Sequence, residues 1–313
     1  MIFWVNGEVF SAVDASTFTK LGNEDYHGFN IGFDNVTHQN YFKGVVDDVR
    51  AYTRSLSAEE VMRLYQMGEG TKISTTIKTP GSPLEQGLVG HWTFDGPDVE
   101  WSSTTAEIED VSGNGNHGDA ASLTNRSVTA GIHGQGMSFN GTSHSSMGDP
   151  ADGSLDPTGS FALSAWVKTT QSVSAGQYGA IAGKGYLNND NGYGLFLNGD
   201  NGSKPTFQAR TGNITVQTDS PSAPVVNDGQ WHLLTGVRDH PNNTTYLYVD
   251  GVLADTATGA LTNYTTGANF GIGKSAYNIS SWRFPLTGSV DDVRLYNRAL
   301  SAEEVQQLYQ LSR

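Results

Sequence analysis

Four oxygen-bearing side chains are spaced so that a cation could join distant parts of this 313-residue chain. Asp95 follows a segment that alternates like a strand, and Asp291 lies in another such segment near the C-terminus. Asp110 and Asn116 belong to the turn-rich stretch 110–118, DVSGNGNHG. Ca²⁺ takes roughly six to eight oxygens from carboxylates, amides and backbone carbonyls, and this set offers all three. The same residue types are also typical of tight turns, so the residues alone leave both interpretations open.

Aromatic side chains next to amides form a second group with chemical potential. Aromatic rings offer flat apolar faces on which sugar rings can stack, while amides bind hydroxyl groups. One cluster contains Tyr186, Asn189 and Tyr193, and another contains Tyr277 and Trp282. The alternative role for any one of these rings is to cover the edge of a β-sandwich. The pattern favours at least one glycan-binding cluster.

Catalytic patterns are weaker than these binding patterns. A glycosidase needs two carboxylates placed across the bond to be cut, and the partly alternating segment 107–110 reads as a loop. Asp291 and Asp292 are adjacent, so on a regular strand they would point to opposite faces and could not act as a pair. The sequence contains no His-x-His pair and no Gly-x-Ser-x-Gly turn. A glycan-cleaving enzyme, either a glycoside hydrolase or a polysaccharide lyase, is therefore the alternative to a binding function.

Composition narrows the class of partner. Lys and Arg number 18 against 32 Asp and Glu, which gives a formal net charge of −14. Nucleic acids and anionic membranes require basic clusters, so this charge argues against both as partners. Cysteine is absent, and no apolar run is long enough to cross a bilayer. The composition fits a neutral ligand or bound cations, without nucleic acid and without membrane insertion.

The elements that must position these residues are predicted to be short strands. Glycine is abundant, at 38 residues, and turn signals such as Asp250-Gly251 recur between apolar segments. This pattern predicts an all-β sandwich of two antiparallel sheets. We expect strands at 87–94, 135–139, 161–168, 180–184, 192–197, 206–210, 213–217, 231–238, 246–249, 268–272 and 288–296.

An internal repeat indicates how these elements are organised. The segment 44–65, GVVDDVRAYTRSLSAEEVMRLY, returns at 288–309 as GSVDDVRLYNRALSAEEVQQLY. Each copy ends in one predicted helix with a Ser N-cap and a Glu three residues later, and we expect the helix across an end of the sandwich.

The repeat also sets the expected domains. We expect residues 1–70 to be the C-terminal part of a first module, 71–86 a linker and 87–313 a complete module. A partial module has open strand edges, so we expect it to dock on its own chain or to pair with another chain as a homo-oligomer.

Taken in order, these segments resemble the laminin-G-like modules of the concanavalin A-like lectin/glucanase superfamily. The matching landmarks are GLVGHWTFD at 87–95, DVSGNGNHG at 110–118, Trp231-His232, YVDG at 248–251 and VDDVRLYNRALSAEEV at 290–305. The resemblance implies a concanavalin A-like jelly roll with one short C-terminal helix per module. In such a sandwich we expect the first and last strands to be neighbours, which would bring Asp95 near Asp291. The resemblance also implies a structural calcium ion there, held first by Asp95, Asn116 and Asp291.

For function, the resemblance implies a non-catalytic polysaccharide-binding module of a larger extracellular or cell-surface protein. An adhesion or protein-interaction module is a further alternative, because the superfamily hosts several functions on one fold. The turn at 139–144, FNGTSH, departs from the acidic segment that many such modules carry there, so no role is transferred to that turn.

Overall fold

The computed structural model describes residues 2–5, 8–12, 49–52, 54–57, 60–61, 83–185, 191–262, 264–278 and 281–311. Contacts divide the chain into two compact units, Met1–Glu69 and Gly70–Arg313. Most of the predicted linker at 71–86 lies outside the described residues. Among the described residues, no helix is long and apolar enough to cross a membrane.

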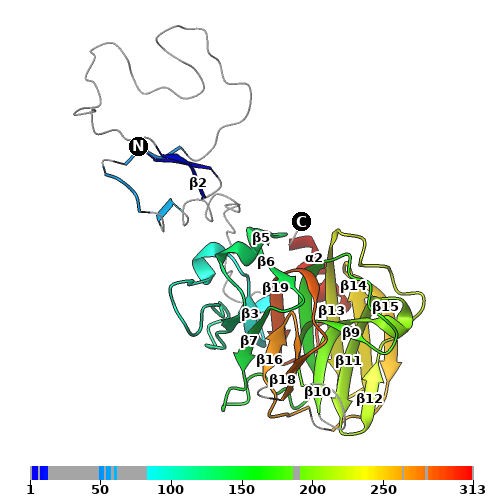
Figure 1. Cartoon of the computed structure of the whole chain (residues 1–313). Helices are drawn as coiled ribbons and strands as arrows, with labels where there is room; N and C mark the ends of the chain where they lie inside the picture. The colour runs from blue at the N-terminus through cyan, green and yellow to red at the C-terminus, as the bar shows by residue number, and fades with distance from the viewer. Residues whose placement is uncertain are drawn as a thin grey trace, which may run out of the picture. The chain divides into compact units, whose positions relative to one another are not determined.

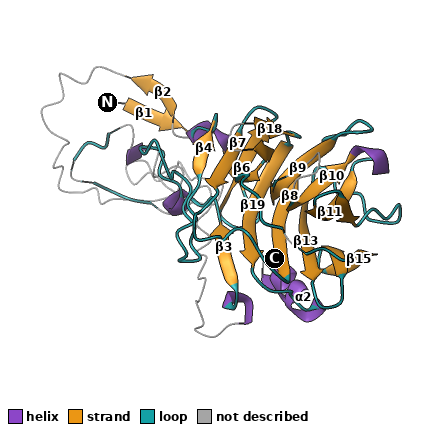
Figure 2. Ribbon diagram, turned by 90° about the horizontal axis from the view of Figure 1, so that it is seen from below, coloured by secondary structure: helices purple, strands orange, loops and turns teal. Residues whose placement is uncertain are grey.

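The second unit is the predicted sandwich of two antiparallel sheets (Figures 1 and 2). Its seven-stranded sheet runs in the order β12-β11-β10-β9-β16-β7-β4, and its eight-stranded sheet runs β15-β14-β13-β8-β19-β6-β5 with β3 also paired to β19. The strands are β3 (Leu88–Trp92), β4 (Asp119–Ala121), β5 (Val128–Ala130), β6 (Gln135–Asn140), β7 (His144–Gly148), β8 (Phe161–Lys168), β9 (Tyr178–Lys184), β10 (Gly192–Asn198), β11 (Lys204–Thr211), β12 (Ile214–Gln217), β13 (Trp231–Asp239), β14 (Thr244–Val249), β15 (Val252–Thr258), β16 (Phe270–Ile272) and β19 (Thr287–Tyr296). Strands β17 (Ser275–Asn278) and β18 (Ser281–Arg283) follow β16 in the chain and precede β19. They pair as a hairpin that forms a separate two-stranded sheet.

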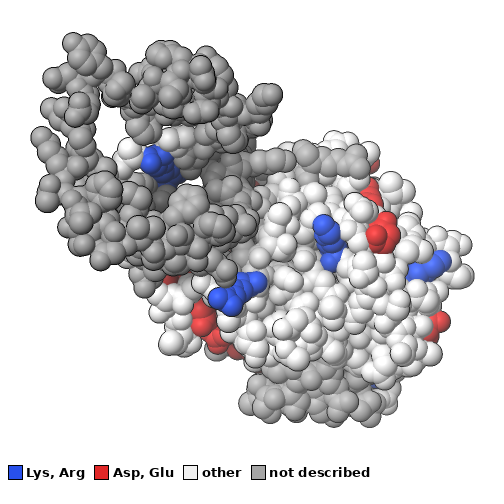
Figure 3. All heavy atoms as spheres, turned by 45° about the horizontal axis from the view of Figure 1, so that its top comes forward, with Lys and Arg blue, Asp and Glu red and all other residues white. Residues whose placement is uncertain are grey.

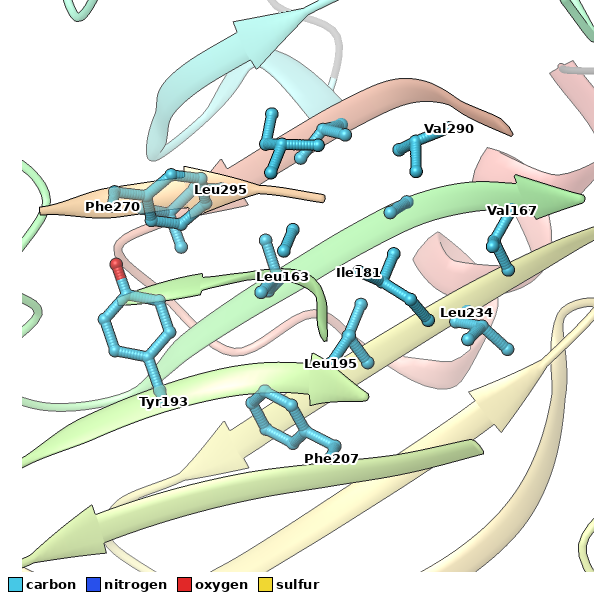
Figure 4. Close-up of a cluster of buried hydrophobic side chains, with 14 of the residues drawn as sticks. Leu163, Val167, Ile181, Tyr193, Leu195, Phe207, Leu234, Phe270, Val290 and Leu295 are labelled. Carbon is cyan, nitrogen blue, oxygen red and sulfur yellow. The ribbon is translucent and has the colours of Figure 1, made fainter. Parts of the chain in front are cut away.

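The main core fills the space between the two sheets. Side chains alternate between the two faces of a strand, so every second residue points into this core. Leu163, Ala165 and Val167 of β8 do so, as do Leu195 and Leu197 of β10. Figure 4 shows such side chains from the facing strands meeting in one layer. Burial of this layer is the main force that holds the loops of the module in place.

The C-terminal helix α2 (Ala302–Leu311) covers the other face of the eight-stranded sheet, which corrects the expected position across an end of the sandwich. Val305 and Leu308 pack with Trp166 of β8 and Leu233 of β13, two side chains that point away from the main core. The sequence pattern showed the apolar stripe of this helix but not which surface it covers. The helix begins with the predicted capping box, because Ser301 Oγ accepts from Glu304 N at 3.2 Å and Glu304 Oε2 accepts from Ser301 N at 2.9 Å.

The first unit repeats this local structure where it is described. β1 (Ile2–Val5) and β2 (Glu8–Ala12) form an antiparallel hairpin. Ser57 and Glu60 form the same reciprocal pair of hydrogen bonds as Ser301 and Glu304, at 2.8 and 3.2 Å. Val49 and Tyr52 are 46% and 45% exposed, whereas their counterparts in β19, Val293 and Tyr296, are fully buried.

Candidate functional site

The pairing of the first and last strands of the module brings two predicted cation ligands to one loop. β3 pairs antiparallel with β19, so Trp92 lies opposite Val293, and the chain leaves β3 towards Asp95 near Asp291. Asp95 Oδ1 accepts a hydrogen bond from Gln135 N at 2.7 Å. Asp291 Oδ2 accepts from Ile132 N at 2.7 Å and from His133 N at 3.2 Å. The expected proximity of Asp95 and Asp291 is therefore confirmed, with the loop 131–135 between them.

Burial makes both carboxylates costly to ionise. It raises the pKa of Asp95 to about 6, and Asp98 and Asp292 add to the rise while the hydrogen bond from Gln135 opposes it. Burial likewise raises the pKa of Asp291 well above its usual value, with repulsion from Asp292 and Asp95 adding to it. A cation beside Asp95 and Asp291 would relieve this repulsion.

Two glycines shape the loop around these carboxylates. A Cβ atom on Gly134 would lie 1.9 Å from Asp95 Oδ1, and one on Gly131 would lie 2.3 Å from Asp291 Oδ2. Gly134 also has a φ of +47°, a conformation that residues with a side chain rarely adopt. The three glycines of the run GIHGQG at 131–136 are the sequence signal for this loop, which the predicted site residues do not include.

Replacing Gly134 by Ala should therefore weaken the module by more than the backbone conformation alone explains. Gly202 is the matched control, since it has a φ of +66° and nothing within 4 Å of its Cβ position. In both variants an alanine must adopt the left-handed backbone conformation, which lowers the free energy of unfolding. Only Gly134→Ala must also displace Asp95, which lowers it by about 1–3 kcal/mol more. Urea unfolding measures the difference. Equal losses in the two variants would show that Gly134 does not hold Asp95 in place.

Asp110 and Asn116 hold the 110–118 loop together through hydrogen bonds, and their part in a calcium site stays a prediction. The Asp110 carboxylate accepts from His91 N and Ser112 N through Oδ1 and from Ser112 Oγ and Asn116 N through Oδ2. Asn116 Oδ1 accepts from Ser154 Oγ at 2.8 Å, and its amide donates to Val89 O at 2.7 Å. These contacts already occupy the side-chain oxygens, so the loop interpretation explains both residues.

A β-bulge changes the geometry of the Asp291–Asp292 pair. The register of β19 against β8 shifts between Asp291 and Arg294, and Asp292 has a φ of +47°. Regular alternation is lost here, and Asp292 contributes to the raised pKa of Asp291. Both side chains are buried, and the prediction that they cannot act as a catalytic pair stays a prediction. The bulge was not visible in the sequence.

Asp292 is the centre of a buried ionic network. It accepts from His91 Nε2 at 2.6 Å and from Arg294 Nε at 3.0 Å. Burial alone would raise the pKa of Asp292, but Arg294 and His91 hold it well below its usual range. Burial, followed by Arg294, lowers the pKa of His91, so this ring is neutral and donates its Nε2–H to the carboxylate.

The structure separates the predicted aromatic residues into three cases. Tyr193 is 2% exposed, its hydroxyl donates to Leu155 O at 2.7 Å, and its ring lies 4.9 Å from that of Phe161, so the prediction that it stacks on a sugar is wrong (Figure 4). Tyr186 and Asn189 lie outside the described residues. Tyr277 and Trp282 lie in the β17–β18 hairpin, whose backbone alone is described there.

Side chains alone do not form a complete metal site in the part of the chain that the structure describes. Among the described residues, no group of three or more His, Asp or Glu is arranged to hold a metal ion. Asp95 and Asp291 would therefore need backbone carbonyl oxygens to complete a calcium shell, as calcium sites commonly do.

The family of the chain follows from comparison with known proteins. A laminin G family model, described as the concanavalin A-like lectin/glucanases superfamily, matches residues 139–306. The chain belongs to this superfamily. The two antiparallel sheets and the covering helix agree with the jelly-roll sandwich expected for it. No curated protein matches the chain.

Solved structures share the fold of this superfamily member at low sequence identity. Domain 4 of AbnA, a GH43 extracellular arabinanase from Geobacillus stearothermophilus solved with arabinotriose, is 22% identical with a TM-score of 0.51, over 71% of this chain and 98% of that domain. The binding domain of Paraclostridial Mosquitocidal Protein 1 is 15% identical with a TM-score of 0.51, over 72% of this chain and 52% of that one. The binding domain of botulinum neurotoxin DC, solved with SialylT, is 13% identical with a TM-score of 0.51, over 74% and 52%. The chain thus spans about half of each toxin domain.

Proposed function

We propose that the second unit is a non-catalytic module that binds a neutral polysaccharide or oligosaccharide. The observation that carries this proposal is the likeness to AbnA domain 4, which the chain covers over 98% of its length and which was solved with arabinotriose. The family, whose description names lectins and glucanases, supports a carbohydrate ligand.

Charge supports a neutral ligand rather than an anionic one. The chain carries a net charge of −14, so it repels polyanions. On the face shown in Figure 3, charged side chains are scattered among many uncharged ones. Sugar hydroxyls can bind such a surface without a charged partner.

The catalytic alternative has less support. Asp291 and Asp292 are 1% and 7% exposed, so a polymer could not reach both. Glu107, from the partly alternating segment, accepts a hydrogen bond from Ala120 N at 3.1 Å, which ties it to β4. Glu107 and Glu109 line one open pocket with Glu100, so that pocket is the place where the catalytic alternative would have to act.

A structural calcium ion is part of the proposal. Asp95 and Asp291 fit it because each has one oxygen bound to backbone N–H groups, while the described residues give no hydrogen bond to the other oxygen. The ion would neutralise both carboxylates and tie the exit of β3 to the loop 131–135 and to β19. Its role there is to hold the loop, and no chemistry on the ligand is assigned to it.

We place the module in an extracellular or cell-surface protein, by analogy with the arabinanase, which is extracellular. Pairing of the first unit with another chain stays a prediction, and the exposed Val49 and Tyr52 are the side chains that such pairing would cover.

The test is a pull-down on insoluble neutral polysaccharides, with linear arabinan included and a polyanion such as pectate for comparison. Each tube is run with Ca²⁺ or with EDTA and is assayed for new reducing or unsaturated ends. We expect retention on a neutral polysaccharide without product. New sugar ends would show that the module cleaves glycans and would contradict the non-catalytic proposal. Absence of retention on every polysaccharide would favour a protein partner.

A further inference from the structure

Lys184 carries a buried amine that the proposed binding function does not use. Its side chain is 0% exposed, and lysine is almost never fully buried unless it is paired. It lies at the end of β9, where its pairing partners are Tyr193 of β10 and Phe270 of β16. Partners on neighbouring strands point to the same face of a sheet, so the lysine side chain lies on the core face with these two rings (Figure 4).

Two carboxylates converge on the Lys184 amine. Its Nζ atom lies 2.6 Å from Asp149 Oδ1 and 2.7 Å from Asp156 Oδ2. The side chain of Asp149 is 33% exposed, whereas that of Asp156 is 9% exposed. One ammonium and two carboxylates leave one unbalanced negative charge in a site largely shielded from water, and such burial of charge is costly.

Strand pairing brings Asp149 to the amine. β16 lies between β7 and β9, so Phe270 has Gly148 as its partner on one side and Lys184 on the other. Asp149 directly follows Gly148, at the point where the chain leaves β7. Its carboxylate therefore reaches the amine from two strands away.

A separate set of contacts holds Asp156. The Tyr193 hydroxyl donates to Leu155 O at 2.7 Å, which fixes the chain immediately before Asp156. Thr266 N donates to Asp156 Oδ1 at 3.2 Å. One oxygen of this carboxylate thus faces a backbone N–H group while the other faces the amine. A backbone N–H group in this position stabilises negative charge that develops on the oxygen it faces.

We propose that Lys184 and Asp156 form an intramolecular isopeptide bond, with Asp149 as the proton-transfer group. The bond joins the end of β9 to the loop between β7 and β8. It gives the module a covalent cross-link, in a chain whose lack of cysteine rules out disulfides. The inference is independent of the proposed sugar-binding function.

The reaction balances without any further reactant. The Lys184 ammonium gives a proton to Asp156 Oδ2, and the neutral amine then forms a bond to Asp156 Cγ. The negative charge that develops on Oδ1 faces the N–H group of Thr266. Asp149 takes one proton from the attacking nitrogen and passes it to the Oδ2 hydroxyl, whose bond to Cγ breaks as water leaves. An amide remains, and Asp149 is a carboxylate again.

Proximity and burial both favour this reaction. The amine and the carboxyl group are held in contact, so no encounter between separate molecules is needed. The bond removes the charges of Lys184 and Asp156 from the buried site. The remaining negative charge belongs to Asp149, which is the most exposed of the three and lies on the side where water can leave.

Intact mass spectrometry of the full chain tests the bond directly. We expect a mass that is lower than the sequence mass by one water. Trypsin does not cut after an acylated lysine, so the digest should contain one branched peptide in which 127–168 is joined to 169–210. Fragmentation of this peptide should locate the link at Lys184 and Asp156.

Variants assign the roles of the three groups. Lys184→Met lacks the amine and Asp149→Asn lacks the proton-transfer group, so each should have its full sequence mass. Asp149→Glu keeps a carboxylate and should restore the loss of water. The matched control is Lys168→Met, which makes the same change at the exposed end of β8 and should still lack one water.

Two results would overturn the inference. A wild-type chain at its full sequence mass, with normal cleavage after Lys184, would show that the three groups form ion pairs only. Loss of ammonia from Asp149→Asn would show that position 149, rather than Asp156, is acylated. The wild-type mass and the branched peptide decide whether the bond exists, so a variant that does not fold leaves this test intact.

Discussion

Replacing Asp292 by Asn is expected to destabilise the module by about 3–5 kcal/mol, because the Arg294 guanidinium would stay buried without its negative partner. Asp292 and the Nε2 atom of His91 are 2.6 Å apart, and the side chains of both residues are at most 10% exposed. Arg294 Nε lies 3.0 Å from the same carboxylate oxygen. The network joins β3 to the bulge of β19, so its loss should also loosen the strand pairing on which Asp95 and Asp291 depend. Urea unfolding of the full chain measures the loss.

The matched control is Asp228→Asn. Asp228 also pairs with a histidine, His232, at 3.2 Å, but its side chain is 47% exposed. Water screens that pair, so the control should unfold within error of the wild type. If both variants lower the free energy of unfolding equally, burial does not make the Asp292 network more important for stability than the exposed Asp228–His232 pair.

Calcium should raise the melting temperature of EDTA-treated protein at pH 7.5 by roughly 5–10 °C at a free concentration of about one hundred times its dissociation constant. Without the ion, Asp95 and Asp291 repel each other at one loop, and burial raises the pKa of both. Asp95→Asn should stabilise the metal-free protein at this pH and abolish its response to calcium. Differential scanning calorimetry with and without calcium compares the two proteins.

The response should also depend on pH, in a direction set by Asp95. Its pKa is about 6 in the folded chain and ordinarily 3.8, so between these values the folded state holds the proton more often. The metal-free protein therefore gains this stabilisation below about pH 4 and loses it as pH rises through 6. Calcium should stabilise most above pH 6 and least near pH 4. An equal response at both pH values, or an unchanged response in Asp95→Asn, would contradict the assignment.

Long regular strands were predictable because their alternation or apolar run is strong. The expected strand 161–168 matches β8 over Phe161–Lys168, and 288–296 matches β19 within one residue. Short or polar strands were missed, namely β4, β5, β7, β15 and the hairpin β17–β18. In β15, VLADTAT, much of the strand is exposed at the sheet edge, so no apolar face marks it.

The sequence predicts the positions of site residues only where the pairing of two strands brings those residues together. Pairing of the first and last strands placed Asp95 beside Asp291, and the resemblance supplied that pairing before the structure did. Tyr193 lies in the expected strand 192–197, and its spacing from Leu195 and Leu197 puts it on the core face, so this alternation contradicts a sugar-stacking role for its ring. The Asp292 bulge depends on backbone geometry that no residue type there announces.

Isothermal titration with the polysaccharide retained in the pull-down shows whether this chain binds a neutral glycan. Arabinotriose is the first soluble oligosaccharide to add, since AbnA domain 4 was solved with it. We expect saturable heat with one site per chain, retained at high salt because a neutral ligand releases no counterions, and no product after prolonged incubation. Absence of saturable heat with every neutral oligosaccharide, or binding that salt abolishes, would contradict it.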